Sequence, residues 1–110
     1  MSVGNMWDMM KQMRGVQDKL QSLQDELKSE RVEGSSGGGM VTAVMDGQQN
    51  LIALNIDPSI VDADDTEMLE ELVVAAMNQT RTQAQTLSQE RLSGLLPPGL
   101  AWLDLGSLGI

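Results

Sequence analysis

With 110 residues and a net charge of -9, the chain is large enough for one small domain, and its overall charge argues against a nucleic-acid partner. It contains no cysteine and no histidine, which excludes disulfides and thiolate metal sites and removes the commonest general base near neutral pH. No segment approaches the roughly 18 apolar residues of a membrane span. We therefore expect a soluble, cytoplasmic protein that is not an enzyme and uses no cofactor or small-molecule substrate.

The first thirty residues carry the clearest periodic pattern. Apolar residues recur at alternating spacings of three and four, which is the a/d pattern of a heptad repeat. The pattern predicts a helix over 5–29, about 35 Å long at roughly 1.5 Å per residue. We call its apolar face the seam. The seam consists of Met6, Met9, Met13, Val16, Leu20, Leu23 and Leu27.

The opposite face of this helix carries an aromatic residue and two cations. With Met6 at heptad position a, Trp7 and Arg14 occupy b and Lys11 occupies f, so these three share the outer face. An aromatic ring beside two cations can stack on or clasp a nucleic-acid backbone. A solvated face with one tryptophan at its rim is the alternative interpretation.

After Ser29 the period of the apolar pattern changes to two, which is typical of strands. We expect short strands over 31–33, 40–45 and 51–57, with an Asp46-Gly47 turn between the last two. Gly34 and the glycines at 37–39 lack the lysine and Ser/Thr of a phosphate-binding loop, so they indicate a flexible connection. The expected strand faces carry Val41, Ala43 and Met45 on one strand and Ile52, Leu54 and Ile56 on the next.

The acidic middle of the chain leads into a second long helix. Asp62 and Asp64 have the first spacing of a calcium loop, but the glycine and glutamate that such a loop needs later are missing, so we expect no metal site. Asp64 with Glu67 instead predicts an N-cap and capping box for a helix over 65–92. Its buried face should carry Leu69, Leu72, Val73, Ala76, Thr80, Ala84 and Leu87.

The end of the chain differs in composition from the rest. Leu96-Pro97-Pro98-Gly99 cannot continue a helix, and the residues that follow are apolar enough to dock on another surface. We therefore divide the chain into one α-β-β-β-α domain, residues 1–96, and a tail, residues 97–110.

Two helices of this length cannot bury their apolar faces against strands of about 17 to 20 Å within one chain. The pattern therefore predicts a homodimer, isologous or intertwined. The residues expected at the dimer interface and in the core are Met6, Met13, Val16, Leu20, Leu23, Leu69, Leu72 and Val73.

Several short segments follow one another along the chain in a characteristic order and spacing. They are Met9-Met10-Lys11-Gln12-Met13, Glu33-Gly34, Gly39-Met40-Val41, Asp46-Gly47, Ile56-Asp57-Pro58-Ser59, Glu67-Met68-Leu69-Glu70-Glu71-Leu72-Val73, Ala75-Ala76-Met77-Asn78 and Leu96-Pro97-Pro98-Gly99. The order of these segments resembles the YbaB/EbfC family of bacterial nucleoid-associated proteins. The resemblance implies an α+β fold in which α-β-β-β-α subunits, each with a three-stranded antiparallel sheet and two long helices, form a dimer that binds DNA.

The distribution of charge makes such a function compatible with the acidic total. Residues 32–80 contain nine acidic groups and no basic one, whereas the flanking segments are neutral overall. We expect a homodimer of the bacterial nucleoid that contacts double-stranded DNA mainly through the backbone and organises the nucleoid or regulates gene expression. The alternative is a protein-interaction adaptor on the same fold. The candidate DNA contacts are Trp7, Lys11, Arg14, Lys19, Arg81 and Arg91.

Overall fold

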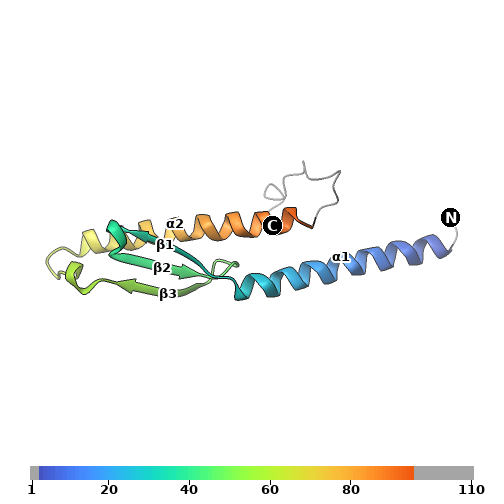
Figure 1. Cartoon of the computed structure of the whole chain (residues 1–110), viewed down its shortest axis with the longest axis horizontal. Coiled ribbons are helices and arrows are strands. Elements are labelled where there is room, and N and C mark those ends of the chain that lie inside the picture. The colour runs from blue at the N-terminus through green and yellow to red at the C-terminus, as the bar shows by residue number, and fades with distance from the viewer. Residues whose placement is uncertain (1–2, 96–110) are drawn as a thin grey trace.

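The computed structural model describes residues 3–95, which form a small sheet, one long helix that runs along it and a second long helix that extends away from it (Figure 1). The predicted α+β fold class and the order α-β-β-β-α are confirmed. The tail assigned to residues 97–110 lies outside the described residues. The elements are α1 (Val3–Ser29), β1 (Val32–Ser36), β2 (Val41–Met45), β3 (Leu51–Ile56) and α2 (Thr66–Ser93), with 3-10 turns at Gly37–Gly39 and Pro58–Ile60.

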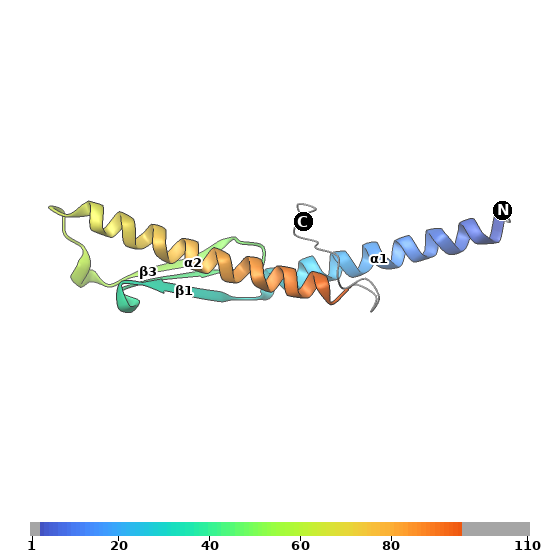
Figure 2. The same cartoon turned by 90° about the horizontal axis from the view of Figure 1, so that it is seen from above.

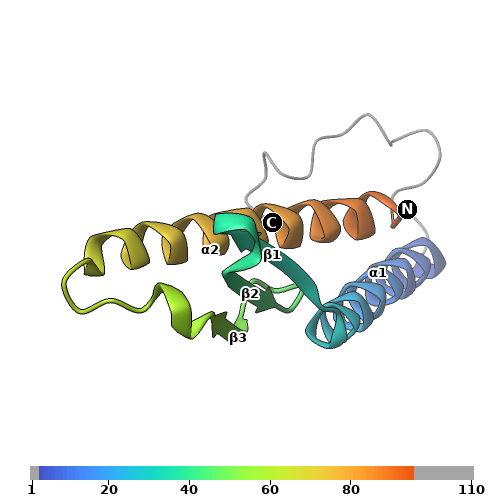
Figure 3. The same ribbon diagram turned by 60° about the vertical axis from the view of Figure 1, so that its left-hand side comes forward.

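The strands form one antiparallel sheet in the order β1-β2-β3. Gly34 lies opposite Ala43, and Ala43 lies opposite Leu54, so these paired positions share a face of the sheet. α2 runs along the sheet, and Figure 3 shows α2 and the strands as two layers while α1 leaves to one side. The predicted inward face of β2 is confirmed, because Val41, Ala43 and Met45 are buried.

β1 is longer than the predicted 31–33 and includes Gly34, which the sequence placed in a flexible connection. The reason is a close approach of α2. A Cβ on Gly34 would lie 2.8 Å from the backbone nitrogen of Thr80 and closer still to its hydroxyl. Only glycine fits there, so this residue marks packing and not flexibility. The three glycines at 37–39 do form a connection, a tight turn with φ of 59°, 68° and 94°.

Two apolar clusters hold the chain together, and the predicted buried face of α2 contributes to both of them. The cluster between α2 and the sheet contains Val41, Ala43, Ile60 and Ala76, with Ile56, Leu69, Leu72, Val73 and Met77 packed against it. The second, which we call the leucine cluster, lies between the ends of α1 and α2 and consists of Leu23, Leu27, Leu87 and Leu92.

The N-terminus of α2 differs from the prediction by one residue. Its N-cap is Asp65, whose carboxylate accepts the N–H of Met68 at 3.4 Å. The prediction that Asp64 caps the helix in a box with Glu67 was wrong. The N–H of Asp64 donates to the carboxylate of Asp62 at 2.9 Å, which turns the chain before the helix begins.

The first part of α1 projects away from the body of the molecule (Figure 2). Every residue from 5 to 22, a segment that we call the arm, is exposed to solvent. The chain is accordingly elongated, with extents of 74 × 24 × 18 Å. None of the helices in residues 3–95 combines the length and apolar character needed to cross a bilayer.

Candidate nucleic-acid interface

The outer face of the arm presents the aromatic residue and two cations that the sequence placed together. Trp7 is 58% exposed, and Lys11 and Arg14 are exposed on the same stretch of α1. Within residues 3–95, neither cation makes an ion pair. Two free cations beside an exposed indole can approach a phosphate backbone without first breaking a contact.

Arg81 provides a third exposed cation, on α2. It follows Thr80, whose buried hydroxyl donates to the carbonyl of Ala76 at 2.7 Å, so the helix turns Arg81 away from the sheet. The surrounding turns carry uncharged polar residues such as Thr82 and Gln83. A polar surface without carboxylates does not repel phosphate.

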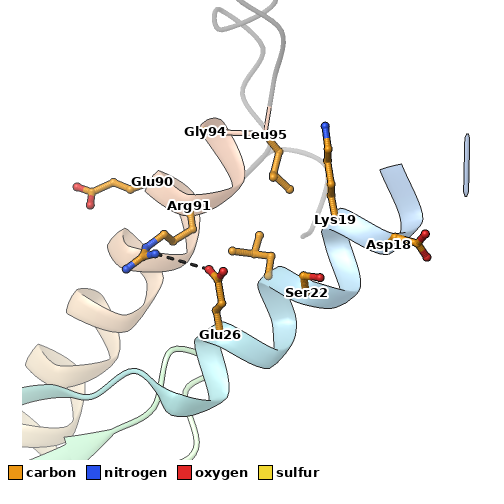
Figure 4. Close-up of a pocket in the computed structure, with 9 residues that line it drawn as sticks. Asp18, Lys19, Ser22, Glu26, Glu90, Arg91, Gly94 and Leu95 are labelled. Atoms are coloured by element: carbon orange, nitrogen blue, oxygen red, sulfur yellow. Dashed lines mark ion pairs between the residues drawn. The ribbon is translucent and has the colours of Figure 1, made fainter. Parts of the chain in front are cut away.

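The structure places the other two predicted cations differently. The guanidinium of Arg91 lies 2.6 Å from a carboxylate oxygen of Glu30 and 3.7 Å from one of Glu26, so it joins the end of α2 to the end of α1. Lys19 lies across from it on the wall of a cleft between the two helices (Figure 4). Sequence reasoning could not find the Arg91 pair, because its partners are about sixty residues away.

The residues predicted for the dimer interface and the core separate into two groups. Leu23 is buried in the leucine cluster, and Leu69, Leu72 and Val73 pack into the core beside the sheet, all within one chain. The remaining four are exposed on the arm, where Met13 and Val16 line a shallow groove of about 390 Å³. The exposed group is Met6, Met13, Val16 and Leu20.

A second exposed apolar surface lies on β3, which is an edge strand of the described sheet. Leu51, Ile52 and Leu54 are 44%, 49% and 36% exposed. An exposed apolar edge strand readily pairs with another chain. Only part of the predicted alternation holds here, because a bulge between Leu51 and Ala53 displaces Ile52 from the regular register.

A polar loop after β2 holds the base of the arm. The sequence predicts only a turn at Asp46-Gly47 and does not indicate that this loop contacts α1. The N–H of Gly47 donates to the carbonyl of Leu27 at 2.8 Å, and the side chain of Gln48 donates to that of Gln24 at 2.8 Å. These bonds fasten α1 to the sheet, so the direction of the arm is set by the body.

Asp46 organises this loop from a buried position. Its carboxylate accepts the N–H groups of Gln48 and Asn50 and the side-chain amide of Asn50, at 2.8 to 2.9 Å. Burial is the largest influence and raises the pKa of Asp46, but these hydrogen bonds together outweigh it, so the pKa is lowered below its usual value. The loop therefore depends on an ionised carboxylate.

Both the α-β-β-β-α order and the sequence of this chain have counterparts among known proteins. Residues 1–100 match the YbaB/EbfC DNA-binding family. The chain belongs to this family. YbaB/EbfC is a DNA-binding family and not an enzyme family, which confirms the prediction that the protein is not an enzyme.

Similar proteins support the assignment to YbaB/EbfC. A nucleoid-associated protein of Saccharopolyspora erythraea is 43% identical over 106 residues, covering 96% of this chain and 91% of the relative. A nucleoid-associated protein of Caldanaerobacter subterraneus subsp. tengcongensis is 42% identical over 100 residues, covering 87% and 90%. The fold matches the crystal structure of an uncharacterized Helicobacter pylori protein with a TM-score of 0.72 at 22% identity, covering 88% of this chain and 99% of that one.

Proposed function

We propose that the protein is a nucleoid-associated homodimer that binds double-stranded DNA mainly through its phosphate backbone, and that it organises the nucleoid or regulates gene expression. The observation that carries the proposal is the outer face of the arm, where Trp7, Lys11 and Arg14 are exposed with no carboxylate paired to them among the described residues. Membership of a DNA-binding family supports it.

The charge pattern favours contacts at the arm and on the second half of α2. Arg81 is the only charged residue between Leu72 and Gln89, whereas the first turns of α2 present Glu67, Glu70 and Glu71. Carboxylates repel phosphate at short range, so the acidic part of the body faces away from DNA in this proposal. Arg91 contributes less than the free cations, because it is already paired with two carboxylates.

Two exposed apolar surfaces support the homodimer. The seam of the arm and the edge of β3 are both exposed among the described residues, and a helix in a protein takes most of its stability from packing of its apolar face. A two-fold partner covers such surfaces by placing the same patch on both subunits. It also doubles the number of cations that face one DNA molecule.

Analytical sedimentation tests the dimer. We expect about twice the chain mass of 11.9 kDa at micromolar concentration. The variant Val16→Asp should shift the equilibrium towards the monomer, because it places a carboxylate on the seam. Gly15→Asp is the matched control, since it adds the same charge where nothing lies within 4 Å of the site. A native protein that sediments as a monomer contradicts the proposed assembly.

A gel-shift titration on two duplexes of unrelated sequence tests the DNA function. We expect similar affinity for both duplexes and a steep loss of affinity between low and moderate salt, because phosphate contacts release counterions. The competing function is an adaptor that docks proteins through the apolar arm. Its binding would change little with salt, and it would leave both duplexes unshifted.

A further inference from the structure

A cleft of about 530 Å³ lies where the end of α2 meets α1 (Figure 4). Leu23 and Leu95 give it apolar walls, and Leu23 also belongs to the leucine cluster. Its charged lining combines two cations, Lys19 and Arg91, with the carboxylates of Asp18, Glu26 and Glu90. Its volume is in the range of about 300 to 1,000 Å³ typical of sites that enclose a ligand. The cleft therefore offers an apolar seat with charged groups around it.

The chain leaves the body of the molecule at this cleft. α2 ends at Ser93, and Leu95, two residues later, is itself part of the lining. Residues 96–110 therefore start at the cleft, and 15 residues span at most about 50 Å when extended. The segment is therefore long enough for its later residues to reach back to the cleft.

The sequence of this segment is complementary to the cleft. Pro97, Pro98 and Gly99 prevent α2 from continuing and allow the chain to reverse. In the sequence, Trp102 stands between Leu100 and Leu103, and Asp104 is the only charged residue after Arg91. The apolar residues suit the leucine walls. The carboxylate suits Lys19, which has no ion pair within residues 3–95. The apolar residues of its stretch 100–105 are Leu100, Ala101, Trp102, Leu103 and Leu105.

We propose that residues 100–105 of the same chain occupy this cleft, with Trp102 extending the leucine cluster and Asp104 beside Lys19. We choose this segment over another molecule as the occupant because the chain continues directly from Leu95, a residue of the cleft lining. Docking would fasten the end of α2 to α1 in addition to the Arg91 ion pairs. This inference does not depend on DNA binding.

Engineered cysteines provide the first test, because the natural chain contains none. Ser22 lines the cleft, so the variant Ser22→Cys with Leu103→Cys should form a disulfide within one chain under mild oxidation. On a non-reducing gel, the product migrates as a compact monomer that reverts on reduction. The control pairs Leu103→Cys with Gln21→Cys, one residue away on α1 and outside the cleft lining, and should cross-link several-fold less.

Two outcomes of this experiment would overturn the proposal. A disulfide that joins two chains would assign the segment to the cleft of a second copy. Equal cross-linking of the Ser22 and Gln21 variants, or none in either, would show that the segment does not occupy the cleft.

Tryptophan fluorescence gives a second test that introduces no new bond. In a Trp7→Phe background, Trp102 is the only tryptophan, because the chain has two. We expect its emission to be blue-shifted and several-fold less quenched by acrylamide than in a synthetic peptide of residues 96–110. Ser22→Glu should reverse both effects, whereas Gln21→Glu should not, with circular dichroism verifying that both variants fold. Emission identical to that of the free peptide would contradict docking.

Discussion

The two long helices have nearly the same length, 27 and 28 residues, but α2 buries its apolar face along most of its length, whereas α1 buries only Leu23 and Leu27 among the described residues. α2 buries three small residues, Ala76, Thr80 and Ala84, and Thr80 lies where the helix closely approaches Gly34 of the sheet. The arm of α1 carries larger residues such as Met13 and Val16, which remain exposed. Small residues permit a fitted contact with the chain's own sheet. Flexible methionines suit a surface that packs against a partner.

The two regions also differ in charge, and the difference has a functional meaning. All charged residues between residues 32 and 80 are acidic, whereas the arm contains free cations. A protein of net charge -9 can contact phosphate if its cations project beyond its carboxylates, since exposed charges more than about 10 Å apart are largely screened at 0.1 M salt. The elongated shape provides that separation.

The largest effect on stability is expected where α2 approaches the sheet. Gly34→Val places a side chain against the backbone of Thr80 and should lower the free energy of unfolding by about 1 to 3 kcal/mol or more. Chemical denaturation measures this change. Gly15→Ala on the arm meets nothing within 4 Å and should instead increase helicity. Equal tolerance at both positions would contradict the fitted contact of the body.

The polar loop at the base of the arm should be the next most sensitive site. Asp46→Asn replaces a carboxylate oxygen by a donor that faces other donors, so we expect a loss of about 1 to 3 kcal/mol in unfolding free energy at pH 7. Because the folded-state pKa of Asp46 is lowered, its contribution is present above the ordinary Asp pKa of about 3.9 and is lost as the pH falls. The difference between native and variant should therefore shrink in acid. A pH-independent difference would refute this role.

A smaller effect should distinguish the two aspartates before α2. Asp65→Ala removes the N-cap and should cost about 0.5 to 2 kcal/mol of unfolding free energy. Asp64→Ala should cost less, because the structural bond of Asp64 comes from its backbone N–H, which alanine retains. Thermal denaturation of the two variants compares them directly. If Asp64→Ala lowered the thermal stability more than Asp65→Ala, the assignment of Asp65 as the N-cap would be incorrect.

Much of the fold could be predicted because the spacing of apolar residues and the type of each residue determine helices and strands locally. The heptad of α1 and the apolar face of α2 both extend over many residues, so each prediction rested on repeated evidence. The N-cap could not be resolved, since Asp62, Asp64 and Asp65 are chemically equal and only the bend of the chain selects among them. Gly34 was misinterpreted because its constraint comes from Thr80, far along the chain.

The part of the candidate site that lies on one helix could be predicted from the sequence, whereas its contacts between distant segments could not. Trp7, Lys11 and Arg14 lie on one helix face, so heptad spacing alone brings them together. The pairing of Arg91 with Glu30 depends on how the two helices meet, which no local pattern contains. The anchoring of α1 by Gln48 likewise depends on a contact between distant segments.

The salt dependence of DNA affinity tests the central claim, that the exposed cations of the arm contact the phosphate backbone of DNA. Lys11, Arg14 and Arg81 give six cations in a dimer, which predicts a log-log slope of about -5 if all contact phosphate. Changing Lys11 and Arg14 together to glutamine should weaken binding to all sequences equally and flatten the slope by about 4.

The matched control for this measurement changes Lys28 and Arg31 to glutamine at the base of the arm. The guanidinium of Arg31 already donates to the backbone carbonyls of Lys28 and Glu30, so this pair should affect the slope much less. A flattened slope for the Lys11 and Arg14 variant alone is the result that our account predicts. A larger change in the control, or a loss that depends on DNA sequence, would contradict it.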